Sequence, residues 1–150
     1  MKKWILLLAV LWLTQSCKKK SGGEDTPHYA IEVQYGDKEM KFEDFMLLKN
    51  GPLYALRSPA NADVLLMIVV DEEEVVIGSE VNDPERAAVV MAVDANGTEL
   101  FSVESCENYV GVVEELSENP LHMKGRFEFD YIDDNNQRIH VKGKFDATAE

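Results

Sequence analysis

The sequence predicts an all-β fold: a single antiparallel β-sandwich, or a small open barrel, of about eight strands. After residue 27, apolar and polar residues alternate with a period of two, and turn-forming residues interrupt the alternation at short intervals. No long stretch of the sequence has the 3.6-residue period of an amphipathic helix. The last two expected strands also fit each other as a hairpin, with complementary residues on both faces.

The N-terminal half of the domain contains a predicted hairpin and a long apolar strand. Residues 29–35 and 40–42 alternate on either side of a turn at Gly36-Asp37, whereas residues 42–48 fit either a helix or a strand. Residues 64–70 are all apolar, as expected of a strand that is covered on both faces. Residues 75–77 are predicted to form a short strand that ends at Gly78.

The middle of the chain contains the clearest turn signal. Asn96-Gly97 lies between two expected strands, residues 87–93 and 99–103, and favours a tight hairpin. Residues 82–84 can begin either a turn or a helix, and we expect a brief turn that leads into the strand. Residues 109–113 are predicted to form one more strand.

The C-terminal hairpin has enough pattern to predict its register. A turn centred on Asn135 gives the inward pairs Tyr131–Ile139, Phe129–Val141, Phe127–Gly143 and Gly125–Phe145, so each glycine meets a phenylalanine. The same register gives the outward pairs Glu128–Lys142, Asp130–His140 and Arg126–Lys144, of which only the last is unfavourable. A shift by one residue would pair buried faces with exposed ones.

The C-terminal half also resembles a known family. Three segments carry the resemblance: Gly111-Val-Val-Glu-Glu, Met123-Lys-Gly-Arg-Phe-Glu-Phe and Val141-Lys-Gly-Lys-Phe. With Val75-Val-Ile-Gly-Ser before them, they are similar to a domain of unknown function that is common in Bacteroidetes-type lipoproteins, over residues 75–146. The resemblance implies the same β fold and brings no activity and no site residue.

Residues 1–20 have the three-part layout of an export signal. Lys2 and Lys3 precede ten apolar residues, which as a helix would span only about half of the ~30 Å hydrocarbon core of a bilayer. Leu13-Thr14-Gln15-Ser16-Cys17 resembles the lipobox of bacterial lipoproteins, except that Thr14 stands where the family favours leucine. The resemblance implies that residues 1–16 are cleaved off and that Cys17 carries acyl chains such as palmitate, which hold the protein at a membrane.

Residues 17–27 are predicted to be the lipidated cysteine and a flexible tether, and residues 28–150 one β domain. The tether is polar and contains glycine and serine, and its three lysines either contact anionic headgroups or are solvated. In the lipoprotein resemblance, an aspartate directly after the cysteine implies retention in the inner membrane. Lys18 stands there, so we expect the outer membrane, on either its periplasmic or its surface side.

Composition restricts the classes of partner. The chain has 15 basic and 28 acidic residues, a net charge of −13; removing Lys2 and Lys3 with the signal leaves 13 basic residues and a charge of −15. This charge argues against nucleic acid, and it fits solubility or a cationic partner. Once Cys17 is lipidated, Cys106 is the only other cysteine, so we expect no internal disulfide.

No residue pattern predicts catalysis, a metal site or a cofactor. His28, His122 and His140 are not expected to share a metal, because the hairpin register separates the last two along the sheet, and Cys106 has no identifiable histidine partner. The acidic groups at residues 71–74 and 133–136 are interpreted as turns, with weak calcium binding as the alternative. The tyrosines that could line a ligand site are Tyr35, Tyr54, Tyr109 and Tyr131, although alternation places Tyr35 and Tyr131 with core residues.

We therefore expect a non-enzymatic, membrane-tethered module of the cell envelope that binds an envelope protein or a small molecule. The first alternative is a structural subunit of an outer-membrane assembly, and the second is an envelope hydrolase with two carboxylates across a cleft. A large apolar surface would favour the subunit, whereas a deep apolar pocket would favour binding of a small ligand.

Replacing Cys17 tests the anchor. Serine lacks the thiol that carries the lipid, so we expect Cys17→Ser to release the domain from the membrane or to leave an uncleaved precursor. Lipid labelling and membrane fractionation measure both outcomes, with Cys106→Ser as the matched control. Unchanged labelling and retention in Cys17→Ser would show that Cys17 is not the anchor.

Overall fold

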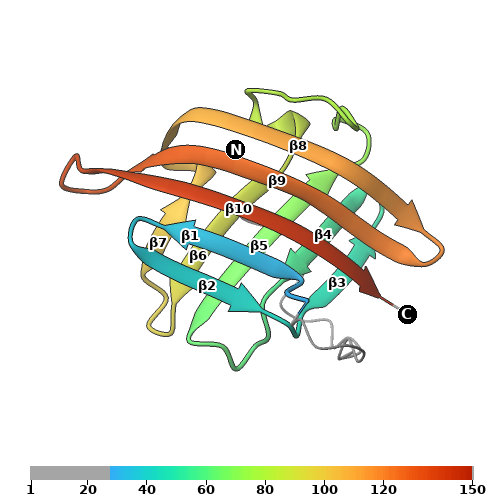
Figure 1. The fold of residues 1–150 in the computed structure, drawn as a ribbon, viewed down its shortest axis with the longest axis horizontal. Helices are drawn as coiled ribbons and strands as arrows, with labels where there is room; N and C mark the ends of the chain where they lie inside the picture. Colours follow the sequence, from blue (N-terminus) through green and yellow to red (C-terminus); the bar gives the residue numbers. More distant parts are fainter. Residues whose placement is uncertain (1–27, 150) are drawn as a thin grey trace.

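Residues 28–149 are described by the computed structural model, and they form two antiparallel five-stranded sheets packed face to face (Figure 1). The first sheet has the strand order β2-β1-β10-β9-β8, and the second has the order β3-β4-β5-β6-β7. The strands are β1 (Ile31–Tyr35), β2 (Lys38–Phe42), β3 (Met46–Asn50), β4 (Leu53–Arg57), β5 (Val64–Asp71), β6 (Val89–Asp94), β7 (Glu99–Ser102), β8 (Cys106–Glu118), β9 (Leu121–Ile132) and β10 (Arg138–Ala149). The predicted all-β sandwich is confirmed, with ten strands rather than about eight.

The path of the chain brings the two ends of the domain together. After the β1–β2 hairpin, the chain crosses to the second sheet, builds β3 to β7, and returns to the first sheet for β8 to β10. β10 pairs with β1, so strands from both ends of the domain lie side by side in the first sheet (Figure 1). The start of the described chain is fixed there, because the Ala30 N–H donates to the Phe42 carbonyl (2.8 Å) and the Ala30 carbonyl accepts from the Asp146 N–H (2.9 Å).

The predicted turns and the C-terminal hairpin register are confirmed. Gly36 and Gly97 have positive φ angles of 54° and 80°, which the glycines at these turns adopt without strain. β9 and β10 pair in the predicted register, with Tyr131 opposite Ile139 and Gly143 opposite Phe127. The unfavourable outward pair, Arg126 opposite Lys144, is also present.

Three glycines on the inner face of the first sheet lie beneath aromatic rings. A Cβ atom at Gly143 would overlap the ring of Phe127, and one at Gly125 would lie 2.6 Å from Cζ of Phe145. A Cβ atom at Gly111 would overlap the ring of Tyr109. The rings therefore occupy the volume that side chains would need at these positions, and this lets aromatic residues fill the core between the sheets.

The hydroxyl of Tyr109 joins the two sheets. It donates to the Ala88 carbonyl (2.8 Å) and accepts from the Ala88 N–H (3.1 Å), so β8 of the first sheet is linked to the segment before β6 of the second. Tyr109 is buried, and burial raises the pKa of its phenol, so the hydroxyl stays protonated and keeps both roles. Both backbone groups of Ala88 would otherwise be buried without a partner.

The short strand predicted at residues 75–77 is wrong. This segment makes only isolated bridges to β8, from Ile77 to Val113 and from Val81 to Gly111, with the Gly78 N–H donating to the Val113 carbonyl (2.8 Å). Three apolar residues between acidic residues and a glycine are too few to establish a ladder. The segment instead runs along the edge of β8 and satisfies part of its backbone.

The segment before β6 forms one helical turn, the alternative to a plain turn, and the expected strand follows it. Its 3-10 helix η1 (Pro84–Arg86) is capped by the Asp83 side chain, which accepts from the Glu85 N–H at 3.0 Å. A second 3-10 helix, η2 (Val103–Ser105), joins β7 to β8. Neither of these short helices, the helical elements of residues 28–149, could span a bilayer.

The two sheets have outer faces of opposite character. The outer face of the first sheet carries charged side chains on β1, β9 and β10, which pair as Glu32–Lys144 and Asp130–His140. The outer face of the second sheet carries the cluster Leu53, Ala55, Met67 and Val69, which are 3–8% exposed and packed against Leu48, Val89 and Met91. We call this cluster, with the outward residues beside it on β3 to β6, the apolar face.

Adding one methyl group at Gly143 tests the packing of rings on glycines. The methyl group of Gly143→Ala would overlap the ring of Phe127, so we expect a loss of about 1–3 kcal/mol in the free energy of unfolding. Urea denaturation measures it. Lys142→Ala, on the outer face of the same strand, is the control and should stay within about 0.5 kcal/mol of the parent chain.

Combining Gly143→Ala with Phe127→Leu provides the second arm of this test. The smaller side chain makes room for the methyl group, so the double variant should be more stable than the sum of the two single losses predicts. Strict additivity of the two losses would contradict the proposed overlap.

Candidate functional site

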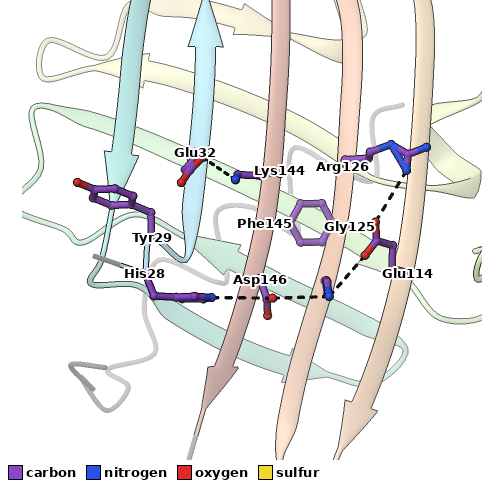
Figure 2. Close-up of a pocket in the computed structure, with 10 residues that line it drawn as sticks. His28, Tyr29, Glu32, Glu114, Gly125, Arg126, Lys144, Phe145 and Asp146 are labelled. Carbon is purple, nitrogen blue, oxygen red and sulfur yellow. Dashed lines mark ion pairs between the residues drawn. The ribbon is translucent and has the colours of Figure 1, made fainter. Parts of the chain in front are cut away.

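The outer face of the first sheet contains a shallow groove of about 380 Å³ (Figure 2). Its side chains come from the start of the described chain and from β1, β8, β9 and β10, which the topology places next to one another. The lining residues are His28, Tyr29, Glu32, Glu114, Lys124, Gly125, Arg126, Lys144, Phe145 and Asp146. A smaller hollow beside it, of about 200 Å³, shares Glu32, Arg126 and Lys144 with it and adds Lys142.

A chain of alternating charges runs across the groove (Figure 2). The carboxylate of Asp146 lies 3.9 Å from Lys124 Nζ, which lies 3.7 Å from Glu114, and Glu114 lies 3.8 Å from the Arg126 guanidinium. A separate pair joins Lys144 to Glu32 at 2.9 Å. Three cations and three carboxylates therefore neutralise one another in the groove, while the whole chain has a net charge of −13.

These ion pairs explain how the unfavourable Arg126–Lys144 pair is tolerated. Lys144 is held by Glu32 on β1, whereas Arg126 turns toward Glu114 and toward Glu80 at 3.5 Å. The cations are 37–67% exposed, so each pair contributes little to stability. The pairs mainly fix the orientation of polar groups that line a nearly neutral groove.

Two carboxylates of the groove converge, but on a lysine rather than on an open space. Glu114 and Asp146 both lie within 4 Å of Lys124 Nζ. A glycosidase needs room for a sugar between its two carboxyl groups. The ammonium group of Lys124 occupies that room, so this arrangement does not favour the hydrolase alternative.

The three histidines each contact carboxylates on the outer face of the first sheet. His122 Nε2 lies 3.0 Å from Asp146 and His140 Nδ1 lies 3.0 Å from Asp130, while His28 lies 4.0 Å from Asp146. The register places His122 opposite Thr148 and His140 opposite Asp130, at separate positions along β10. No group of three or more metal-ligating side chains that could hold an ion occurs among residues 28–149.

The two acidic groups are turns, as interpreted from the sequence. An oxygen of Asp71 accepts from the Glu73 N–H at 3.0 Å. An oxygen of Asp133 accepts from the N–H groups of Asn135 (2.9 Å) and Gln137 (2.8 Å). In both places the carboxylate closes a loop on its own backbone, as aspartate does in Asx turns.

The four tyrosines considered as ligand-facing residues belong to the core instead. Tyr54, Tyr109 and Tyr131 are buried members of the main cluster, and Tyr35 packs against it with its ring 5.3 Å from that of Phe101. Burial, followed by a hydrogen bond to Glu99, raises the pKa of Tyr131 to about 12. Cys106 is a half-buried free thiol whose pKa is raised by burial, which fits packing rather than nucleophilic chemistry.

Tyr29 also lies at the groove, and the sequence pattern does not single it out as a site residue. Its ring has Lys41 Nζ at 5.3 Å from the centroid. Its place at the start of an alternating run groups it with core residues such as Ile31 and Val33. Because the groove joins residues as far apart as His28 and Asp146, its composition follows from the topology and could not be read from local patterns.

The apolar face is the second candidate site. Its described members all come from β3, β4, β5 and β6, and the described strands form only two layers, so no third described layer lies on it (Figure 1). The sequence signal was the apolar run at residues 64–70, which predicted a strand covered on both faces. β5 does have buried apolar residues on both faces: Leu66, Ile68 and Val70 belong to the main cluster, and Met67 and Val69, 3–5% exposed, belong to the cluster on the outward side.

One cation lies within the apolar face. The guanidinium of Arg57 is half-buried, and its described hydrogen-bond acceptor is the thioether of Met46, with Nη2 at 2.8 Å and Nε at 3.1 Å from Sδ. A thioether is a weak acceptor compared with a carboxylate. No carboxylate among residues 28–149 lies within ion-pair distance of Arg57.

Comparison of the chain with protein-family models, curated proteins and solved structures finds no match. The site residues are therefore assigned from geometry alone. Cys17, the predicted lipidation site, lies outside the described residues, as do the predicted signal at residues 1–16 and the tether.

The charged face gives a prediction about acid stability. The His140 side chain, and then the Asn108 amide, donate hydrogen bonds to Asp130 and hold the pKa of its carboxyl below the usual value. A carboxyl group with a lowered pKa in the folded state stabilises the fold above its unfolded pKa of about 3.9, and this contribution disappears as the pH falls through the folded pKa.

We therefore expect Asp130→Asn to lower the midpoint of urea unfolding at neutral pH. The difference from the parent chain should shrink as the pH falls below about 4. Asp134→Asn, in the exposed turn between β9 and β10, is the control and should track the parent chain at every pH. A difference between Asp130→Asn and the parent that does not change with pH would contradict the assignment.

Proposed function

We propose that the chain is a membrane-tethered lipoprotein of the cell envelope whose β domain is a non-enzymatic accessory module that acts by docking to protein. The observation that carries this proposal is the apolar face. Apolar side chains cover the outward side of four neighbouring strands, β3 to β6, where a domain that acts alone would present polar groups. An outer sheet face of this composition is typical of a sheet that packs against another element or a partner rather than facing solvent.

The contrast between the two outer faces supports the same proposal. β9 and β10 alternate strictly, with charged residues outward, so this chain does place polar residues on an outer face. β4, β5 and β6 instead have apolar residues on both faces. The centre of the face is only 3–8% exposed, so the partly exposed residues around it, Leu48, Val89 and Met91, are the ones that a partner would contact.

The groove of the first sheet supports a second candidate function, the binding of a small polar ligand. Its volume of about 380 Å³ lies within the range of ligand sites. The groove combines the Tyr29 ring with hydrogen-bond donors such as Lys124 and Arg126, which together fit a neutral, hydroxyl-rich molecule. The groove is shallow and charged, however, and ligand sites are usually apolar and enclosing, so protein docking is the leading proposal.

Site-specific photo-crosslinking in intact membranes tests the docking proposal. A photoreactive residue replaces Met91 on the apolar face or, as the control, Lys142 on the charged face. We expect covalent adducts from position 91, with none from position 142, and loss of the adducts when Leu48→Glu introduces a charge into the same face. Circular dichroism confirms that each variant folds, and the mass of the adduct identifies its components.

Two other outcomes of the crosslinking experiment would contradict the docking proposal. Adducts from position 142 alone would indicate that the partner binds at the outer face of the first sheet, beside the groove, and not at the apolar face. An absence of adducts from both positions, with every variant folded and tethered, would refute the docking proposal.

A further inference from the structure

The smaller hollow beside the groove has an excess of cations. It lies between two rows of outward side chains, which are Glu32, Lys144 and Arg126 on one side and Glu39, Gln34 and Lys142 on the other. Val33 and Gly143, which pair with each other between the rows, also line it, and the Val33 side chain is buried in the core. The floor of the hollow is therefore main chain, and its walls carry three cations and two carboxylates.

Both carboxylates of the hollow are already paired. The carboxylate of Glu39 lies 2.8 Å from Lys41 Nζ, and that of Glu32 lies 2.9 Å from Lys144 Nζ. Lys41 does not line the hollow, so Glu39 is neutralised from outside, and Glu32 offsets one of the three cations within. Two of the three positive charges therefore remain in excess.

The other two cations have donors available to a ligand. The register places Lys142 opposite Glu128, but Glu128 lies 3.2 Å from His140 Nε2, and Lys142 forms no ion pair with a carboxylate of residues 28–149. The described ion pairs of Arg126 are long, at 3.5 and 3.8 Å. A close charged hydrogen bond from nitrogen to oxygen measures about 2.7–2.9 Å, so neither side chain is held by one within this part of the chain.

The clustering of these cations has a cost. Ten basic residues follow residue 27, and three of them line this one hollow. Arg126 lies directly opposite Lys144 and diagonal to Lys142, and like charges in such positions destabilise a sheet. The core does not require them, because all three point outward. A local arrangement that lowers stability without serving the core is expected where the protein contacts a ligand.

We propose that this hollow binds the phosphate group of a sugar or polyol phosphate, whose neutral part lies in the adjoining groove. A phosphate monoester carries a charge of about −1.5 to −2 at pH 7 and presents three strong acceptor oxygens, which match the excess charge and the three cations. Arg126 and Lys144 line both the hollow and the groove, so a ligand that they hold spans both. The inference rests on the second candidate function, because it names the ligand class of the groove.

The three cations are close enough to share one phosphate. Side chains directly opposite each other in a sheet have Cβ atoms about 4.5–5.5 Å apart, and diagonal neighbours lie about 7–8 Å apart. Arg126 and Lys144 form an opposite pair, and Arg126 and Lys142 a diagonal one. Arginine holds two phosphate oxygens with its planar fork, and lysine adds a point charge, so the three long side chains complement one another.

The net charge of −13 does not prevent an anion from binding here. Charges farther away than about 8 Å are largely screened at physiological ionic strength. The carboxylates that flank the cations, Glu32, Glu39 and Glu128, each contact a lysine or a histidine already. The local potential is therefore positive. Because the cations are exposed, we expect binding to be weak and to weaken further as salt is added.

Titration with glucose 6-phosphate, followed by two-dimensional amide NMR, tests the proposal. The chain from residue 17 onward, with Cys17→Ser, contains every described strand and carries no lipid. We expect saturable shifts of the amide signals of Val33 and Gly143, at the floor of the hollow. Arg126→Gln or Lys142→Gln should weaken binding at least about tenfold, because each removes a charged hydrogen bond.

Two variants with the same chemical change serve as matched controls. Arg138→Gln is the control for the arginine, and Lys38→Gln is the control for the lysine. Both residues are exposed, and neither lines the hollow or the groove, so both variants should bind as the parent chain does. The dispersion of the amide signals shows whether each variant is folded, so that unfolding is not mistaken for a loss of binding.

Two further ligands define the chemical class and its source. Glucuronate has a carboxylate in place of the phosphate and should bind more weakly than glucose 6-phosphate, whereas equal affinity would overturn the phosphate assignment. Cosedimentation with phosphatidylcholine vesicles that contain phosphatidic acid tests a lipid source of the same group. Cosedimentation that Arg126→Gln removes would identify a lipid headgroup as the ligand, and binding of the soluble ester alone would identify a free phosphate ester.

The outcomes separate this inference from the proposed function. An absence of saturable shifts with glucose 6-phosphate, or binding that persists in both Arg126→Gln and Lys142→Gln, overturns the phosphate site. If glucose alone still shifts the amide signals of groove residues such as Lys124, the groove binds a neutral ligand and only the phosphate site falls. The docking proposal is tested separately by crosslinking, because the apolar face lies on the other sheet.

Discussion

The structure depends on aromatic rings that lie over glycines on the inner face of the first sheet. Phe127 fills the space above Gly143, Phe145 fills that above Gly125, and Tyr109 fills that above Gly111. Without side chains at these glycines, the rings lie down against the sheet and the opposing sheet can close over them. Tyr109 adds a polar bond to Ala88 on the opposing side, so one ring both fills the core and fixes the position of the second sheet.

This inner packing separates the two outer faces and leaves them free to differ. The outer face of the first sheet consists of paired charges that neutralise one another, and the outer face of the second sheet is apolar around Arg57 and Asp71. Neither difference is needed to build the core, because the main cluster comes from the inward residues of both sheets. The outer residues are therefore best understood through what the domain contacts.

The fold class and the C-terminal hairpin could be predicted because the alternation and the turn residues that specify them lie close together in the sequence. Two faces of one hairpin gave independent pairs, such as Glu128 with Lys142 and Phe127 with Gly143, and only one register satisfied both. The segment at residues 75–77 was mistaken for a strand because its three apolar residues carry no information about the edge of β8 that they follow. The groove was not predictable, since it joins residues more than 100 positions apart, whereas the apolar run at residues 64–70 did signal the second face.

The groove and the apolar face lie on opposite outer faces of the sandwich. Occupying one face does not close the other, so a ligand and a docked protein need not compete. A domain that used both faces would hold two different molecules at once, one on each side.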